Sequence, residues 1–116
     1  MRIAIIDDLE RDARQLADQV STYMSTHRIP ADTPEIFPGG EEFLAGFMPG
    51  VYDIIFLDIY MGELNGIDTA RRLRKLGVEA PIIFLTASPD FALESYEVEA
   101  SGYLLKPADE EQTNAL

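Results

Sequence analysis

Apolar residues gather in short, nearly continuous runs along the chain. The four clearest runs are residues 2–6 (RIAII), 53–57 (DIIFL), 81–85 (PIIFL) and 102–105 (GYLL). Strands that are apolar at almost every position are covered on both faces, as in a parallel sheet. A fifth run, EIFP at 35–38, contains Pro38. Because proline cannot donate to a strand ladder, we expect this fifth strand at an edge of the sheet.

The stretches between these runs have apolar residues spaced three and four positions apart, as on one face of a helix. The clearest of these patterns comprises Leu9, Ala13, Leu16, Ala17, Val20 and Met24. Further helices are expected at 41–47, 66–76, 90–100 and 108–116, the last of them short or truncated. Gly77 directly follows the expected helix 66–76, as a helix-ending glycine does.

Strand and helix therefore alternate through the chain. This order predicts an α/β fold, a doubly wound parallel sheet of five strands with right-handed crossovers and helices on both faces. The 116 residues fit a single domain, 1–116. Ligands of such sheets bind beyond the carboxyl ends of the strands, which is where functional residues are sought.

The charge balance excludes some functions. Nine basic and 21 acidic residues give a formal charge of −12, which repels the phosphates of nucleic acids, so we expect no DNA binding by this domain itself. There is no cysteine, and the apolar runs are far shorter than the roughly 20 residues that span a bilayer. We therefore expect a cytoplasmic protein without a membrane partner.

Polar side chains follow each of the four clear strands. Asp7 and Asp8 end the first, Asp58 the second, Thr86 the third and Lys106 the fourth. In a parallel sheet these residues converge on one edge, where three carboxylates form an oxygen site suited to Mg²⁺. The cation explains how two adjacent carboxylates, which repel each other, are tolerated at the end of a buried strand.

The same residues suit phosphoryl transfer. A hydroxyl and an ammonium group opposite the carboxylates can bind a phosphoryl group, and Asp58 can serve as a carboxylate nucleophile. Each residue alone has a plainer explanation: Asp8 as a helix cap, Asp58 as a turn residue, Thr86 as a strand-end hydroxyl and Lys106 as a surface lysine. Their occurrence at the same end of consecutive strands favours the shared chemistry.

Four segments, IIDD (5–8), FLDIYMGELNG (56–66), FLTAS (84–88) and GYLLKP (102–107), resemble the receiver (CheY-like) domain of two-component response regulators in order and spacing. The resemblance extends over essentially the whole chain. It implies a flavodoxin-like fold with strand order 2-1-3-4-5 and a function as a phosphoacceptor in signalling rather than as an enzyme with its own substrate.

The resemblance also implies roles for single residues. Asp58 would be the phosphoacceptor, and Mg²⁺ would be held by Asp8, Asp58 and the backbone carbonyl of Tyr60, with Asp7 assisting through water. Thr86 and Lys106 would bind the phosphoryl group, and Thr86 and Tyr103 would act as the switch. Tyr60 and Ser88, each two residues after a site residue, would modulate dephosphorylation.

The resemblance implies partners as well. A sensor histidine kinase would supply the phosphoryl group, and the surface formed by 90–116 is a candidate homodimer interface. The segment FALESYEVEASGYLLKP (91–107) is most similar to regulators with a LytTR-type DNA-binding domain, so DNA would be bound only through an output domain beyond Leu116. One departure from the family pattern is Gly62, where many receivers have a proline that fixes the loop.

Two other functions remain open at this point. A phosphatase of the haloacid dehalogenase type needs its nucleophile in a DxD motif at the first strand, but this chain has DDL there and Tyr60 two residues after Asp58. A receiver-like interaction module that is never phosphorylated is the other alternative, although the complete set of five site residues argues against it. Acetyl phosphate with Mg²⁺ separates the three, because only a receiver accumulates a stoichiometric acyl phosphate.

Overall fold

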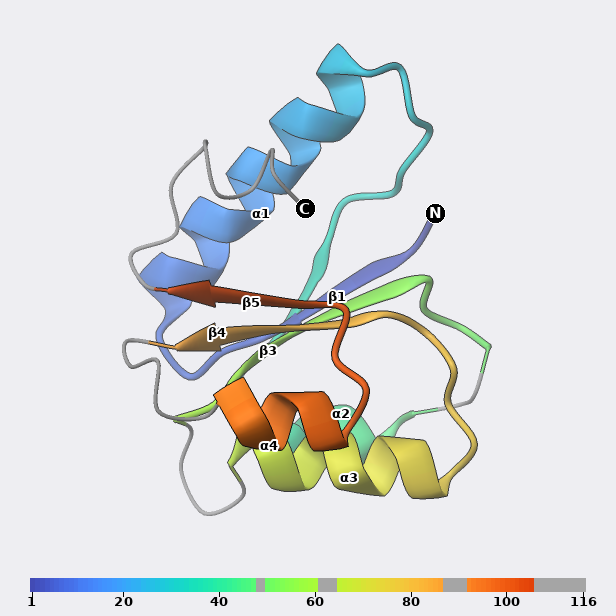
Figure 1. Ribbon diagram of the computed structural model, residues 1–116. Coiled ribbons are helices and arrows are strands. Elements are labelled where there is room, and N and C mark those ends of the chain that lie inside the picture. Colours follow the sequence, from blue (N-terminus) through green and yellow to red (C-terminus); the bar gives the residue numbers. More distant parts are fainter. Residues whose placement is uncertain (48–49, 61–64, 87–91, 106–116) are drawn as a thin grey trace.

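The computed structural model describes residues 1–47, 50–60, 65–86 and 92–105 (Figure 1). The strands are β1 (Ile3–Ile6), β2 (Glu35–Phe37), β3 (Ile54–Asp58), β4 (Ile82–Thr86) and β5 (Gly102–Leu105). The helices are α1 (Glu10–Thr26), α2 (Gly40–Ala45), α3 (Gly66–Lys75) and α4 (Ala92–Glu97). The helix expected at 108–116 lies outside the described residues, as do Lys106 and Ser88.

The five strands form one parallel sheet with the order β2-β1-β3-β4-β5, which confirms the predicted order. The strand with Pro38 next to it, β2, is at an edge, as expected. The middle strand of the sheet is β3, which pairs with β1 on one side and β4 on the other. The acidic ends of β1 and β3 are therefore neighbours.

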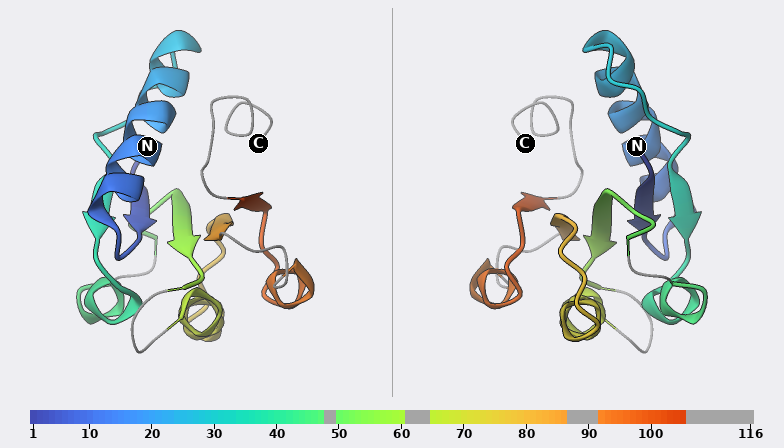
Figure 2. Two further views of the ribbon diagram at one scale, coloured as in Figure 1. Left: turned by 90° about the vertical axis from the view of Figure 1, so that its left-hand side faces the viewer. Right: turned by 90° about the vertical axis from the view of Figure 1, so that its right-hand side faces the viewer.

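Helices cover both faces of the sheet (Figures 1 and 2). Helix α1 packs on one face, and α2, α3 and α4 lie along the other. Successive residues of a strand point to opposite faces, so Ile3 and Ile5 pack with α1, whereas Ala4 and Ile6 pack with α2 and α3. This division explains why the strands are apolar at almost every position.

The two ends of α3 follow from its sequence. Asn65 precedes the helix, and its side chain accepts a hydrogen bond from the backbone N–H of Asp68 at 2.8 Å, which satisfies one of the free donors of the first turn. At the other end Gly77 adopts a φ of +84°, a conformation that glycine tolerates and other residues rarely adopt. The expected helix-ending glycine is thus confirmed.

Arg74, in the basic last turn of α3, does more than offset the helix dipole. Its guanidinium donates hydrogen bonds to the backbone carbonyls of Val78 and Ala80, both at 2.9 Å, in the α3–β4 connection. It also donates to Val98 at 2.9 Å and Glu99 at 3.0 Å, just after α4. Arg74 thereby joins the ends of two helices.

Candidate functional site

Asp7 and Asp8 directly follow β1 but lie in different environments. Asp7 is 2% exposed, and its backbone N–H still donates to Phe37 of β2 at 3.0 Å. Its carboxylate Oδ1 accepts a hydrogen bond from the N–H of Leu9 at 2.9 Å, in the turn that leads into α1. Asp8 is exposed and is not the cap of α1, because the N-cap position is Leu9. The plainer explanation of Asp8 as a helix cap is therefore wrong.

Asp58 is the last residue of β3 and is 2% exposed. The backbone after it stays paired with β4, because the N–H of Ile59 donates to Leu85 at 3.0 Å. The N–H of Tyr60 then turns back and donates to Oδ1 of Asp58 at 3.3 Å. The Asp58 carboxylate is therefore held by the turn that follows it.

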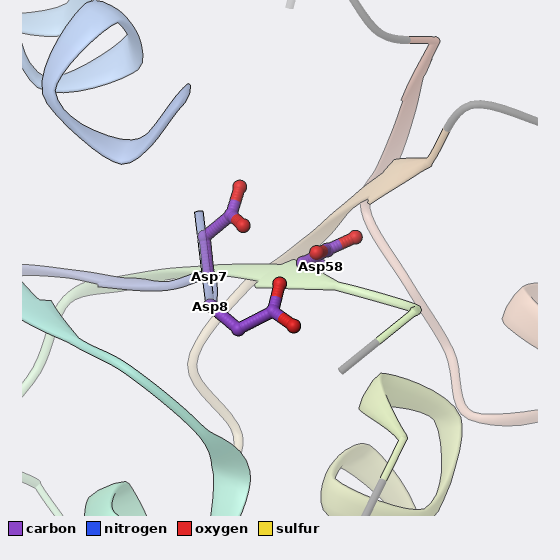
Figure 3. Close-up of side chains that lie close together, drawn as sticks. All are labelled: Asp7, Asp8 and Asp58. Carbon is purple, nitrogen blue, oxygen red and sulfur yellow. The ribbon is translucent and has the colours of Figure 1, made fainter. Parts of the chain in front are cut away.

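The structure brings the three carboxylates together. One oxygen from each of Asp7, Asp8 and Asp58 lies within 4.8 Å of the other two, and Figure 3 shows these side chains at the adjoining ends of β1 and β3. Carboxylate oxygens are the ligands that Mg²⁺ takes in proteins, together with waters. The three gathered carboxylates could therefore hold such an ion.

Two further site residues lie on neighbouring strands. Thr86 is fully buried and ends β4, the strand next to β3. Tyr103 lies on β5 opposite Phe84, and its partly buried side chain packs against the core beneath α2 and α3. Tyr103 thus lies on the strand expected at 102–105, and Thr86, expected directly after the strand 81–85, is the last residue of β4.

The side chain of Tyr60 is 53% exposed. About half of its surface is therefore in contact with solvent, although its backbone N–H is bonded to Asp58.

Gly66, the first residue of α3, has a place at the site that was not predicted from the sequence. Its N–H donates to the carbonyl of Ile59 at 2.9 Å. A Cβ added at Gly66 would lie 2.1 Å from the carbonyl oxygen of Asp58 and 3.0 Å from Cα of Ile59. The available signal was a glycine inside the first turn of a helix, where its helix propensity is poor and another constraint has to explain it.

The fold and the site together define a doubly wound parallel α/β domain with an acidic site beyond the carboxyl ends of its middle strands, where such sheets bind their ligands. Residues 3–116 match the response regulator receiver domain family. The chain therefore belongs to this family: it is a receiver domain of the two-component response regulators, a signalling phosphoacceptor rather than a conventional enzyme.

Two relatives agree with this assignment. The chain is 33% identical over 114 residues to the sensory transduction protein LytR of Staphylococcus epidermidis, covering 98% of this chain and 43% of that protein. It is 35% identical over 111 residues to the positive alginate biosynthesis regulatory protein of Pseudomonas aeruginosa, covering 96% and 43%. The chain thus spans less than half the length of these relatives.

The chemotaxis protein CheY4 of Vibrio cholerae has the same fold, with a TM-score of 0.80 at 23% identity, covering 98% of this chain and 92% of that one. None of the helices among the described residues is long and apolar enough to cross a membrane.

Proposed function

We propose that Asp58 is the phosphoacceptor of this receiver domain. The observation that carries the proposal is the gathering of Asp7, Asp8 and Asp58 within 4.8 Å at the carboxyl edge of the sheet. Among these three residues Asp58 alone belongs to the middle strand, and the turn after it holds its carboxylate through the Tyr60 N–H.

In the proposed reaction an oxygen of the Asp58 carboxylate attacks the phosphorus of a phosphohistidine on a sensor histidine kinase. The P–O bond of an acyl phosphate forms as the P–N bond breaks, and the electron pair of that bond returns to the imidazole. The hydroxyl of Thr86 and the ammonium of Lys106 are the proposed donors to the phosphoryl oxygens. The placement of Thr86 at the end of β4 supports its part, while that of Lys106 rests on the sequence.

Mg²⁺ is the proposed cofactor, held by Asp8, Asp58 and the backbone carbonyl of Tyr60, with Asp7 acting through water. When bound, the cation would neutralise negative charge on the carboxylates and on the incoming phosphoryl group. Asp7 suits the indirect role because its Oδ1 already accepts the Leu9 N–H.

Incubation with acetyl phosphate and Mg²⁺, followed by intact mass spectrometry, tests the proposal. We expect the wild-type chain to gain one phosphoryl group and Asp58→Asn to gain none, because an amide keeps the shape but is not a nucleophile. Asp53→Asn is the matched control, since Asp53 is exposed and precedes the same strand at its opposite end. Labelling that persists in Asp58→Asn, or phosphate release without accumulation of phosphoprotein, would contradict the proposal.

The proposed setting is cytoplasmic, within a longer transcriptional regulator. The support is that the relatives include LytR proteins and that the chain covers 43% of one of them. In this proposal DNA is bound by an output domain outside the present chain. A second copy of the domain is the proposed partner of the 90–116 surface, on which Leu93 and Tyr96 of α4 are 71% and 83% exposed.

We also propose that Tyr60 and Ser88 set the lifetime of the acyl phosphate. The half-exposed ring of Tyr60, two residues after Asp58, is able to restrict the approach of water to the phosphoryl group. The part assigned to Ser88 rests on its place in the sequence, two residues after Thr86.

A further inference from the structure

Gly66 contacts the backbone of the proposed phosphoacceptor although it is eight positions further along the chain. Its own N–H reaches the carbonyl of Ile59, and the space where a side chain would begin is taken by the carbonyl oxygen of Asp58, 2.1 Å from an ideal Cβ. Cβ atoms in proteins essentially never approach another heavy atom within 3.0 Å. Any side chain at position 66 would therefore displace either the start of α3 or the backbone of Asp58.

One peptide group connects Gly66 to the Asp58 carboxylate. The carbonyl of the Ile59–Tyr60 peptide accepts the hydrogen bond from Gly66, at 2.9 Å. The N–H of the same peptide donates to Oδ1 of Asp58, at 3.3 Å. Because a peptide group is planar and stiff, fixing its carbonyl also fixes the direction of its N–H.

We propose that Gly66 is a positioning residue for phosphoryl transfer. It holds the Ile59–Tyr60 peptide in the orientation from which the N–H restrains the Asp58 carboxylate. The inference rests on the proposed role of Asp58 and adds to it the group that orients the nucleophile. It also assigns to the N-terminus of α3 a function beyond packing.

The anchoring of α3 supports this role. Asn65 caps the helix through the N–H of Asp68, and its carbonyl accepts hydrogen bonds from both the backbone and the hydroxyl of Thr69, each at 3.0 Å. Ile67 and Thr69 are buried in the same turn. The helix start is therefore a firm support, and a side chain at position 66 would press on the backbone of Asp58 and Ile59 and so turn the Ile59–Tyr60 peptide that follows.

The test compares two glycine-to-alanine variants at opposite ends of α3. Gly66→Ala introduces the clash with Asp58, whereas Gly77→Ala strains a residue with a φ of +84° and has open space around the new Cβ. Both variants are expected to lose stability, but only the first should affect the site. The readouts are the rate of phosphorylation by acetyl phosphate at saturating Mg²⁺ and the dissociation constant for Mg²⁺, at a temperature where circular dichroism shows both variants folded.

We expect Gly66→Ala to be phosphorylated at least ten times more slowly than wild type at saturating Mg²⁺, and Gly77→Ala to remain within twofold of wild type. A folded Gly66→Ala variant that reacts at the wild-type rate would overturn the inference. So would an equal loss of rate in Gly77→Ala, because it would show that general destabilisation explains the effect.

If Gly66→Ala does not fold, an NMR measurement on the wild-type chain tests the inference instead. In ¹⁵N NMR spectra the Gly66 amide signal should move on addition of Mg²⁺, while that of Gly77 should not. A Gly66 signal that stays fixed in protein that binds Mg²⁺ would refute the inference. A wild-type chain that neither binds Mg²⁺ nor accepts a phosphoryl group would instead refute the proposed function.

Discussion

Asp7 and Asp8 are neighbours in the sequence, yet the fold uses them differently. Asp7 is buried and fixes the turn into α1, whereas Asp8 is exposed beside Asp58. Three carboxylates within 4.8 Å of one another repel, and this repulsion is unfavourable for the folded state. A divalent cation removes this repulsion only in the folded state, because the unfolded chain does not bring the three residues together.

Mg²⁺ should therefore raise the melting temperature of the wild-type domain. At ten times its dissociation constant, a ligand of the native state adds about 1.4 kcal/mol, which corresponds to a rise of roughly 5 °C for a domain of this size. Asp8→Ala should lose most of this rise and, without Mg²⁺, should be at least as stable as wild type. Thermal unfolding followed by circular dichroism, with Ca²⁺-free buffers and chelator controls, measures both effects. An equal rise in Asp8→Ala would contradict the assignment.

The ring of Tyr60 is expected to protect the acyl phosphate from water. Replacing its ring by a small amide, as in Tyr60→Asn, should shorten the lifetime of the acyl phosphate severalfold, because water gains access to the phosphorus. The backbone N–H that bonds Asp58 remains in this variant, so the phosphorylation rate should change less. Phosphate release timed after removal of the donor gives the lifetime. Equal lifetimes in the two proteins would mean that the exposed ring does not protect the bond.

Among the elements, α3 shows what could and could not be predicted from the sequence. Its expected range and its terminal glycine follow from the spacing of apolar residues and from the preference for glycine after a helix, both of which are local. The clash at Gly66 and the four acceptors of Arg74 depend on which backbone groups lie nearby in the folded chain. Such contacts have no local pattern, so the sequence shows Arg74 among the basic residues of the last turn but does not predict its four acceptors.

The residues at the strand ends show the same contrast between what could and what could not be predicted. Asp7, Asp8 and Asp58 could be identified because parallel topology places strand ends together whatever the details of packing. The hydrogen bonds that orient them, from Leu9 and Tyr60, belong to turns whose geometry the sequence does not specify. A helix was expected over 90–100, of which residues 90 and 91 lie outside the described part of the chain; α4 spans Ala92–Glu97 and ends before residue 100 because the chain turns at Glu99, which has a φ of +57°.

Arg74 should be the most important cation of α3 for stability. Arg74→Ala removes four donors to backbone carbonyls, and we expect it to lower the free energy of unfolding by about 2 kcal/mol. Arg72→Ala is the matched control. It removes the same charge from the same turn at an exposed position, where the helix dipole accounts for about 0.5 kcal/mol. Urea unfolding of both variants gives the difference in their free energies of unfolding. Equal losses would mean that Arg74, like Arg72, contributes only through the helix dipole.

Arg74→Ala should also change the local stability of α4. Val98 and Glu99, which follow α4, accept two of the Arg74 hydrogen bonds. Hydrogen exchange in Arg74→Ala should therefore become faster at the end of α4 before it does so in the sheet. Unchanged exchange at α4 would show that Arg74 does not anchor this helix.

At the scale of the whole molecule, α4 and β5 lie at the side of the sheet away from β2, and α4 exposes Leu93 and Tyr96 three residues apart. Large apolar side chains on one helix face favour association with a partner. Phosphorylation can shift a monomer–dimer equilibrium only through contacts that differ between its two states. The buried Thr86, at the end of β4, is in the right place to provide such a difference.

A beryllofluoride mimic of the phosphoryl group should therefore promote self-association of a chain extended beyond Leu116, observed by sedimentation velocity. Tyr96→Glu should abolish the effect. Leu76→Glu is the control, because Leu76 is a similarly exposed apolar residue at the end of α3. Identical sedimentation with and without the mimic, or equal loss in the two variants, would argue against this surface.

The position of the carboxylate cluster also has a kinetic consequence. Asp7, Asp8 and Asp58 lie at the carboxyl ends of β1 and β3, so the three carboxylates meet only when this end of the strand pair has formed. A repulsive contact at the end of a ladder is expected to form late, after the transition state for folding has been crossed. Mg²⁺ should accordingly slow unfolding and leave the refolding rate almost unchanged, which a chevron plot measured with and without the cation would reveal. The cation would then extend the time that each molecule stays folded without affecting how quickly it reaches that state.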